Sequence, residues 1–323
     1  MIETSQPNSK EGGQDVRAPS IIAIVGPTAS GKSALGIEVA LRVGGEIINC
    51  DSVQVYQQIE IATAKVPLEE RRGVAHHLID FVSPIVTFTA ADWARAALQT
   101  IGEIESRGHV AVLVGGSGFY LRALRQPFFP SPATDEDLRE RLTRIRVHKG
   151  PERLHRILQA FDSDEAATLN ARDWPRVQRA IEFYLQTGEK ISSQRSLRPS
   201  PPDVATRLRI FALNPPRAEL YERINRRTEK HFADGLVDEV RQLLERGVPA
   251  NCSALGAHRY RSVDEYLEGK RTLESAIEQA KLDVRHYAKR QLTWFRREPD
   301  VESINGFGDD PQTPAQVHAL LHV

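Results

Sequence analysis

The chain has 323 residues, no formal net charge at pH 7 and 40% hydrophobic residues, so it can bury one large core or two smaller ones. No apolar run approaches the roughly 18 residues of a membrane span, which excludes a chain built around such spans. The two cysteines, Cys50 and Cys252, are too few and too far apart for a disulfide framework or a structural zinc site. We therefore expect a reducing compartment, the cytoplasm.

The first 19 residues are polar and carry several charges and the pair Gly12-Gly13, without an apolar core. Such a composition cannot bury enough apolar surface to fold, and it lacks the apolar stretch of a signal peptide. We predict that residues 1–19 form a disordered tail.

A phosphate-binding loop is the strongest motif. The apolar run 21–25 predicts a strand, and the next eight residues read GPTASGKS, which fits G-x-x-x-x-G-K-[ST]. The apolar residues Leu35, Val39 and Val43 predict a helix directly after it. Strand, glycine-rich loop and helix N-terminus together form an anion site, because backbone N–H groups and the helix dipole both favour negative charge.

The motif predicts roles for its last two residues. Lys32 would reach a terminal phosphate, and the hydroxyl of Ser33 would bind Mg²⁺. The residues predicted to bind diphosphate are Gly26, Pro27, Thr28, Ala29, Ser30, Gly31, Lys32 and Ser33. The motif indicates a phosphate ligand without specifying which one.

An acid at the end of a buried strand usually completes an NTPase site. The best buried-strand candidate, 110–114, ends in Gly115-Gly116-Ser117-Gly118 and offers no carboxylate. Asp51 follows another apolar run, 46–50, and ligands of open α/β sheets bind at the carboxyl ends of strands. Its position leaves three alternatives: a metal ligand, a general base, or the N-cap of a helix that starts at Ser52.

The rest of the chain divides at two proline-rich segments, 128–132 and 199–202. The stretch between them is charged and helical in pattern, and 207–213 predicts one more strand. A long helix pattern then runs from Leu220 to Leu244 and ends at Gly247 and Pro249. A second helical stretch covers 263–297.

These elements predict an α/β fold, a phosphate-loop NTPase-like core with a parallel sheet. The core would comprise residues 20–132 and 203–323, and residues 133–202 would form a helical insertion domain.

Positive charge is concentrated in two segments despite the neutral total. Residues 139–198 hold 13 Lys and Arg against 8 Asp and Glu, and residues 281–297 hold 6 against 1. Basic segments attract nucleic-acid backbones through counterion release, although each segment could also be an ordinary solvated helix face.

Several longer sequence motifs, or words, give the chain a resemblance to a known family. In chain order they are GPTASGKS at 26–33, DSVQVY at 51–56, TAK at 63–65, GGSGFYL at 115–121 and AKRQLTWF at 288–295. Together they resemble the tRNA dimethylallyltransferases, over roughly residues 20 to 300. The phosphate loop is shared with many families, but the other words in this order are specific.

The resemblance implies a reaction. A dimethylallyl group would pass from dimethylallyl diphosphate to N6 of the adenosine at position 37, next to the anticodon of certain tRNAs, and diphosphate would leave. Asp51 matches the catalytic aspartate, Ser117 the hydroxyl residue at the reacting nucleotide, and Arg227 an arginine at the diphosphate. Mg²⁺ is the implied cofactor, and a monomer is expected.

The resemblance also implies tRNA contacts, with the insertion clamping the anticodon stem-loop. The matching positions are Asp51, Ser52, Val53, Gln54, Ser117, Pro175, Arg176, Val177, Gln178, Arg179, Lys289, Arg290 and Gln291. Trp294 and Phe295 could stack on bases, but their adjacent spacing favours core packing. A metal shared by His76 and His77 is disfavoured, because adjacent side chains diverge.

The chain departs from the family pattern at a few positions. Ala62 stands where Gly is usual, and Ser33 and Ser117 stand where Thr is common. His258 and Arg259 replace the Ile and Gly of an I-G-Y-[RK] word at 258–261.

Two other functions fit parts of the pattern. A small-molecule or nucleotide kinase would share the loop, the core and the insertion. However, this chain lacks an acid after Val114, and a kinase function does not explain the DSVQVY motif. A non-catalytic RNA-binding protein with a vestigial loop conflicts with the intact Lys32, Ser33 and Asp51.

Overall fold

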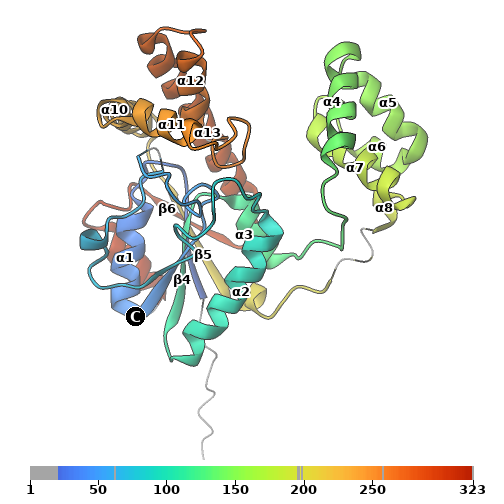
Figure 1. Ribbon diagram of the computed structural model, residues 1–323. Helices are drawn as coiled ribbons and strands as arrows, with labels where there is room; N and C mark the ends of the chain where they lie inside the picture. The colour runs from blue at the N-terminus through green and yellow to red at the C-terminus, as the bar shows by residue number, and fades with distance from the viewer. Residues whose placement is uncertain (1–20, 62, 195–196, 198, 257, 322–323) are drawn as a thin grey trace, which may run out of the picture. The chain divides into compact units, whose positions relative to one another are not determined.

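The computed structural model describes residues 21–61, 63–194, 197, 199–256 and 258–321. Its centre is a six-stranded parallel sheet with the strand order β3-β2-β4-β1-β5-β6 (Figure 1). The strands are β1 (Ile21–Val25), β2 (Gly45–Asn49), β3 (His76–His77), β4 (Val110–Gly115), β5 (Leu208–Asn214) and β6 (Val301–Asn305). The predicted α/β class and the parallel core are confirmed.

Four strands were predicted from the sequence, and two were not. β1 is fully apolar and β4 is apolar up to Gly115, whereas β2 and β5 combine apolar stretches with a few polar residues, and most residues of the four strands are buried. β3 has only two residues, and β6 reads VESIN with only Ile304 buried. Short or polar edge strands carry little periodic signal, which explains why the sequence pattern missed both.

β1 lies between β4 and β5, in register from Ile22 with Val112 and from Ile21 with Leu208. The next helix, α1 (Lys32–Val43), packs Leu35 and Val39 against the sheet in one apolar cluster. All strands are parallel, so the loops after β1, β2 and β4 emerge at the same edge of the sheet. The glycine-rich loop, Asp51 and Ser117 therefore lie together at the carboxyl ends of the strands.

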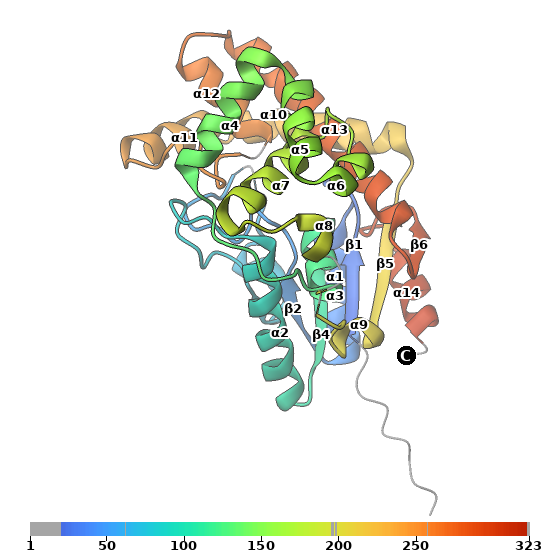
Figure 2. The same cartoon turned by 90° about the vertical axis from the view of Figure 1, so that its right-hand side faces the viewer.

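Helices α10 (Arg217–Ala233), α11 (Leu236–Glu245) and α12 (His258–Leu267) lie beyond one end of the sheet in both views (Figures 1 and 2). The single long helix predicted over 220–244 is wrong: Gly235, with φ of 100°, separates α10 from α11. Glycine alone adopts that backbone readily, and it ends the helix there.

The helical stretch predicted over 263–297 is likewise divided, into α12 and α13 (Leu273–Arg297). α13 begins at the cap residue Thr272, whose hydroxyl accepts a hydrogen bond from the Ser275 N–H. Position 259, where this chain departs from the family glycine, lies in the first turn of α12, so an ordinary helical backbone serves there. The departure at Ala62 lies outside the described residues.

The chain forms two compact units. Unit 1 comprises residues 1–88, 96–118 and 206–323, and unit 2 comprises 89–95 and 119–205. Helices α2 (Ala90–Ser106) and α3 (Gly118–Arg125) have residues in both. The helical insertion predicted at 133–202 falls within unit 2, and the predicted tail 1–19 lies outside the described residues.

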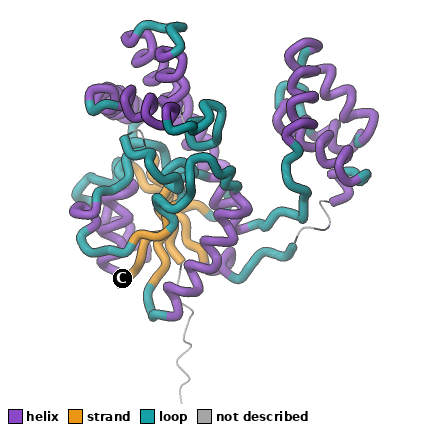
Figure 3. The backbone as a smooth tube through the Cα atoms, in the orientation of Figure 1, coloured by secondary structure: helices purple, strands orange, loops and turns teal. Residues whose placement is uncertain are grey.

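Between residues 126 and 205, the described part of unit 2 is helical and contains no strand (Figure 3). Its helices are α4 (Glu136–Lys149), α5 (Pro151–Phe161), α6 (Ser163–Thr168), α7 (Trp174–Thr187), α8 (Ile191–Gln194) and α9 (Val204–Arg207), of which the last ends in unit 1. Leu142, Leu154, Leu158, Val177 and Ile181 form its buried core. This small core is separate from the apolar cluster of the sheet.

Candidate active site

Two glycines shape the phosphate loop. Gly26 has φ of 145° and Gly31 has φ of 82°, both in the region that side chains disfavour. A Cβ at Gly31 would lie 2.6 Å from the backbone nitrogen of Asp309, which belongs to the segment after β6. The Gly308 N–H also donates to the Ser30 carbonyl at 2.8 Å. The loop is thus held from outside by the C-terminal part of the chain.

Lys32 is the first residue of α1, and its ammonium donates to the Pro27 carbonyl at 2.6 Å. Burial lowers the pKa of Lys32 from 10.5 to about 8; nearby Asp51 partly opposes this shift, and Arg227 adds to it. Burial also lowers the pKa of Arg227, again opposed by Asp51. One carboxylate therefore faces two cations, an environment with spare positive charge for an anionic ligand.

Asp51 follows β2 by two residues and begins a turn. Its Oδ1 accepts a hydrogen bond from the Val53 N–H at 2.9 Å, and its own N–H donates to Asn49 Oδ1 at 3.2 Å. Residues 52–55 form turns, so Asp51 is not the N-cap of a helix, and that alternative from the sequence is wrong. The turn engages one carboxylate oxygen and leaves the base and metal-ligand alternatives open.

Ser117 lies beside Asp51 because the loops after β2 and β4 contact each other. The Ser117 hydroxyl accepts from the Ser52 N–H at 2.9 Å and donates to the Ser52 hydroxyl at 3.2 Å. The Ser117 N–H donates to the Cys50 carbonyl at 3.1 Å. A Cβ at Gly115 would lie 2.1 Å from that same carbonyl oxygen, so the close approach of the loops requires glycine there.

Tyr287 of α13 joins this group, and its hydroxyl is hydrogen-bonded to Ser117. Burial, and then the nearby Asp51 carboxylate, raise the pKa of Tyr287 above its usual value. The phenol therefore stays neutral in the physiological range and can act as a hydrogen-bond donor. No role was assigned to Tyr287 from the sequence, although it directly precedes the word AKRQLTWF.

Several of the predicted residues of unit 1 thus gather around one point. The phosphate loop, Asp51, Ser52, Ser117 and Arg227 are linked by the contacts and electrostatic effects above. The Gln54 side-chain amide donates to the Thr63 carbonyl at 2.9 Å.

The sequence also missed an ion pair beside the phosphate loop. Arg223, one turn before Arg227, donates to both carboxylate oxygens of Asp309 at 2.7 and 2.8 Å and stacks on Phe307. The i, i+4 spacing placed Arg223 on the same helix face as Arg227. No sequence pattern, however, pointed to the segment that follows β6.

On α13, Lys289 and Arg290 are exposed, whereas Gln291 is buried. Phe295 is 4% exposed, so core packing is confirmed for it. The Trp294 ring lies against Gly118, where a Cβ would approach its Cδ1 to 2.2 Å.

The five predicted tRNA contacts in unit 2 lie at the start of α7 and divide by exposure. Pro175 and Arg176 are exposed, and Arg176 pairs with Asp173 at 3.3 Å. Val177 and Gln178 are buried, at 0% and 4% exposure. Their side chains therefore pack inside the unit.

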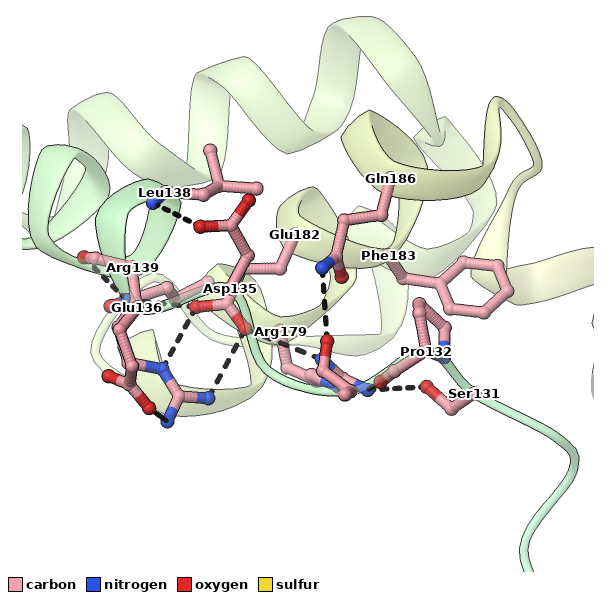
Figure 4. Close-up of polar contacts among 12 residues, drawn as sticks. Ser131, Pro132, Asp135, Glu136, Leu138, Arg139, Arg179, Glu182, Phe183 and Gln186 are labelled. Carbon is pink, nitrogen blue, oxygen red and sulfur yellow. Dashed lines mark hydrogen bonds and ion pairs between the residues drawn. The ribbon is translucent and has the colours of Figure 1, made fainter.

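Arg179 is engaged within unit 2 (Figure 4). Its guanidinium donates to the Ser131 hydroxyl and, at 2.9 Å, to the Pro132 carbonyl, and it pairs with Glu182 at 3.5 Å. Glu182 is 1% exposed and also accepts from Arg139. This network fastens the segment 131–132 to α7.

The described residues contain no group of three or more His, Cys, Asp or Glu that could hold a metal ion. The Glu46 carboxylate instead contacts His77 at 2.6 Å, Arg107 at 2.8 Å and His109 at 2.6 Å. Across the same described ranges, no helix is long and apolar enough to span a membrane.

Comparisons with known proteins show which family the chain resembles. A family model described as IPP transferase matches residues 54–298. Two curated relatives, from Solibacter usitatus and Koribacter versatilis, are both named tRNA dimethylallyltransferase and are 44% identical. Each match covers 90% of this chain and 94% of the relative.

Solved structures are similar as well. A tRNA isopentenylpyrophosphate transferase from Bacillus halodurans has a TM-score of 0.70 at 37% identity, with 94% of this chain and 96% of that chain covered. A eukaryotic dimethylallyltransferase, described as acting on tRNA, has a TM-score of 0.76 at 27% identity, with 93% and 77% covered.

Proposed function

The chain belongs to the IPP transferase family, and we propose that it transfers a dimethylallyl group from dimethylallyl diphosphate to a tRNA. The acceptor is N6 of the adenosine at position 37, next to the anticodon, and the second product is diphosphate. The observation that carries the proposal is the gathering of Lys32, Arg227, Asp51 and Ser117 at one edge of the sheet.

The donor diphosphate would lie in the phosphate loop. The first-turn amides of α1, Lys32 and Arg227 supply positive potential where negative charge develops as the diphosphate leaves. Lys32 donates to the Pro27 carbonyl in this structure, and an arriving phosphate oxygen would replace that partner. The donor's five-carbon end would then point towards the loop that carries Ser117.

The transfer forms one bond and breaks another. N6 of the adenosine attacks the first carbon of the donor, the bond from that carbon to the diphosphate oxygen breaks, and one N6 proton must leave. Asp51 would accept that proton, since its Oδ1 is held by the Val53 N–H while the carboxylate faces the cations of the site. A positioned base of this kind contributes about 10²–10⁴-fold.

Ser117 and Tyr287 would orient the acceptor. Their hydroxyls and Ser52 form a hydrogen-bonded group beside Asp51, and these groups can bind the edge of a base. The target base must leave its stack to reach them, and an anticodon loop makes this inexpensive because its bases are unpaired.

The site fits Mg²⁺ through hard oxygen ligands. The Ser33 hydroxyl lies in the first turn of α1, next to the loop that would hold the donor, and the Asp51 carboxylate would be a second ligand only if it is not the base. Mg²⁺ needs few protein ligands, because phosphate oxygens and water complete its shell. When bound, the ion would neutralise charge on the leaving diphosphate.

Contacts to the tRNA are proposed for exposed basic residues in both units, foremost Arg176 in unit 2 and Lys289 and Arg290 in unit 1. We propose that the protein works in the cytoplasm as a monomer. Cys50 and Cys252, both described residues, are not joined in a disulfide, which is compatible with a reducing compartment.

A direct assay tests the function. The purified protein is incubated with dimethylallyl diphosphate, Mg²⁺ and an anticodon stem-loop RNA, and the mass of the RNA is measured by mass spectrometry. We expect a gain of one five-carbon unit, and no gain when the target adenosine is replaced by guanosine. ATP with the same RNA serves as the control for a kinase, and phosphate transfer without prenylation would overturn the proposal.

A further inference from the structure

One face of α13 packs on two loops at the carboxyl ends of the strands. Tyr287, Gln291 and Trp294 follow one another at spacings of four and three residues, so they share a face of the helix. Tyr287 contacts Ser117 through its hydroxyl, and Trp294 lies against Gly118. Between them, the Gln291 side chain is 5% exposed and points into the same region.

The Gln291 amide bridges the phosphate loop and the loop after β4. Its Oε1 accepts from the Thr28 N–H at 2.9 Å, and its Nε2 donates to the Gly116 carbonyl at 2.9 Å. An amide offers an acceptor and a donor at adjacent atoms, and both are used here. A single side chain of α13 therefore satisfies backbone groups from two loops that follow different strands.

The loop after β4 is built to admit this amide. A Cβ at Gly116 would lie 2.1 Å from Gln291 Nε2, a distance that no side chain tolerates. The backbone of Gly116 has no positive φ, so the residue is not required for its conformation. Its lack of a side chain serves the close approach of Gln291.

We infer that Gln291 is a positioning residue that sets the phosphate loop relative to the Ser117 loop. The inference rests on the proposed function, in which one loop holds the donor and the other contacts the acceptor base. Group transfer requires the two reacting atoms to be aligned at near-contact distance, and a misplacement of about 1 Å can cost about 10²-fold in rate. The Gln291 amide fixes the spacing on which this alignment depends.

Gln291 differs from its neighbours Lys289 and Arg290. The family resemblance groups it with Lys289 and Arg290 as a tRNA contact. Those two side chains are exposed, whereas the Gln291 amide is buried and already hydrogen-bonded on both sides. Its effect on the reaction would therefore pass through the loops, and RNA affinity would change little when it is replaced.

Two variants test the role. Gln291→Met keeps the length and volume of the side chain but removes both hydrogen bonds. Gly116→Ala keeps Gln291 and displaces its amide by crowding. In single-turnover assays with both substrates saturating, we expect each variant to lose about 10²-fold in rate. The dissociation constants for donor and stem-loop RNA, measured separately, should stay within about threefold of wild type.

The double variant adds a further readout. Both changes break the same bridge, so the double variant should be little slower than the slower single variant. Thr293→Ala is the matched control on the same helix, because the Thr293 hydroxyl donates only to the Lys289 carbonyl of its own helix. This control should react at the wild-type rate, and thermal melting of every variant identifies any general loss of folding.

The failures can be told apart. A normal saturating rate in Gln291→Met, or rate losses that multiply in the double variant, would overturn the positioning role while wild-type prenylation continues. A loss of donor affinity above tenfold with an unchanged saturating rate would also overturn it, since Gln291 would then only shape the phosphate site. Absence of prenylation by the wild-type protein would overturn the proposed function itself.

Discussion

The ammonium of Lys32 and the carbonyl of Pro27 are hydrogen-bonded at 2.6 Å, so the lysine of the phosphate loop folds back onto the loop itself. This bond partly compensates for the burial of the ammonium, but burial still lowers its pKa to about 8. A bound diphosphate would offer Lys32 a far stronger partner. The protonation of Lys32 should therefore control donor binding.

We expect the affinity for dimethylallyl diphosphate to fall as the pH rises through about 8. Lys32 is protonated below that pH and loses its charge above it, and the diphosphate prefers the charged form. Calorimetric titration from about pH 7 to about pH 9.5 measures the effect. Lys32→Ala should bind the donor weakly at every pH, with little change in RNA affinity.

Lys32→Arg is the matched control, because a guanidinium keeps its charge throughout this range. Its donor affinity should not depend on pH in this window. A decline of the same size in Lys32→Arg as in wild type would assign the pH dependence to another group.

Glu46 should contribute stability that is lost in acid. Hydrogen bonds that the carboxylate accepts from Arg107, and further ones from His109 and His77, lower the pKa of Glu46 from 4.5 to about 2, against the opposing effect of burial. A lowered carboxyl pKa means that the unfolded chain takes up the proton first. The stabilisation is thus present above about pH 4.5 and disappears as the pH falls towards about 2.

Glu46→Gln should lower the unfolding free energy at neutral pH by about 1–2 kcal/mol, because its partners are partly exposed and screened. Urea denaturation at a series of pH values measures this, and the wild-type advantage should shrink in acid. Glu70→Gln, at an exposed position, is the control. Since Glu46 lies at the start of β2, away from Asp51, its loss should leave the saturating rate unchanged.

Arg176 and Arg179 should respond differently to replacement by alanine. If each contacts a phosphate, each variant should flatten the slope of log K against log salt concentration by roughly 1. Arg179→Ala should also destabilise unit 2, because this side chain holds residues 131–132. Arg176→Ala should leave stability almost unchanged, since its ion pair with Asp173 is solvent-exposed.

Binding of the stem-loop at several salt concentrations, together with thermal melting, tests both expectations. Arg241→Ala is the control, because Arg241 is another exposed arginine in an i, i+3 pair with an aspartate. An unchanged slope in Arg176→Ala would show that this side chain belongs to a solvated face alone. Replacement of Lys289 and Arg290 extends the test to unit 1.

The parts of the fold that the sequence predicted are those that local patterns encode. The runs before Gly26 and Gly115 are apolar throughout, as is typical of buried parallel strands, the run before Asp51 has an apolar centre, and the glycine-rich loop has a fixed spacing. The break at Gly235 was missed because the apolar period continues across it, although the positive φ of this glycine divides the helix.

Long-range relationships were not predictable in the same way. The bond from Thr28 to Gln291 spans 263 positions, and no local pattern pairs the two residues. The same holds for Arg223 and Asp309, which meet only when β6 joins the sheet edge beside β5. The resemblance identified the words that line the site, but their mutual contacts follow from the meeting of the loops after β2 and β4 and from the packing of α13 on them.

Asp51→Asn distinguishes the two remaining roles of Asp51. Asparagine keeps the shape and can still accept the Val53 N–H bond seen at Oδ1, so the turn should persist. It cannot accept the N6 proton at neutral pH. If Asp51 is the base, both substrates should bind almost normally, and the single-turnover rate should fall by about 10²–10⁴-fold.

A series of Mg²⁺ concentrations separates this outcome from a metal-ligand role. If Asp51 binds Mg²⁺, donor affinity should fall in the variant, and added Mg²⁺ should restore much of the rate. If Asp51 is the base, added Mg²⁺ should restore little. Removal of Asp51 also takes away the carboxylate that raises the pKa of Lys32. The pH above which donor affinity falls should therefore shift below about 8 in either case. A near-normal rate with asparagine at this position would contradict the mechanism, because the chemistry would then proceed without the carboxylate.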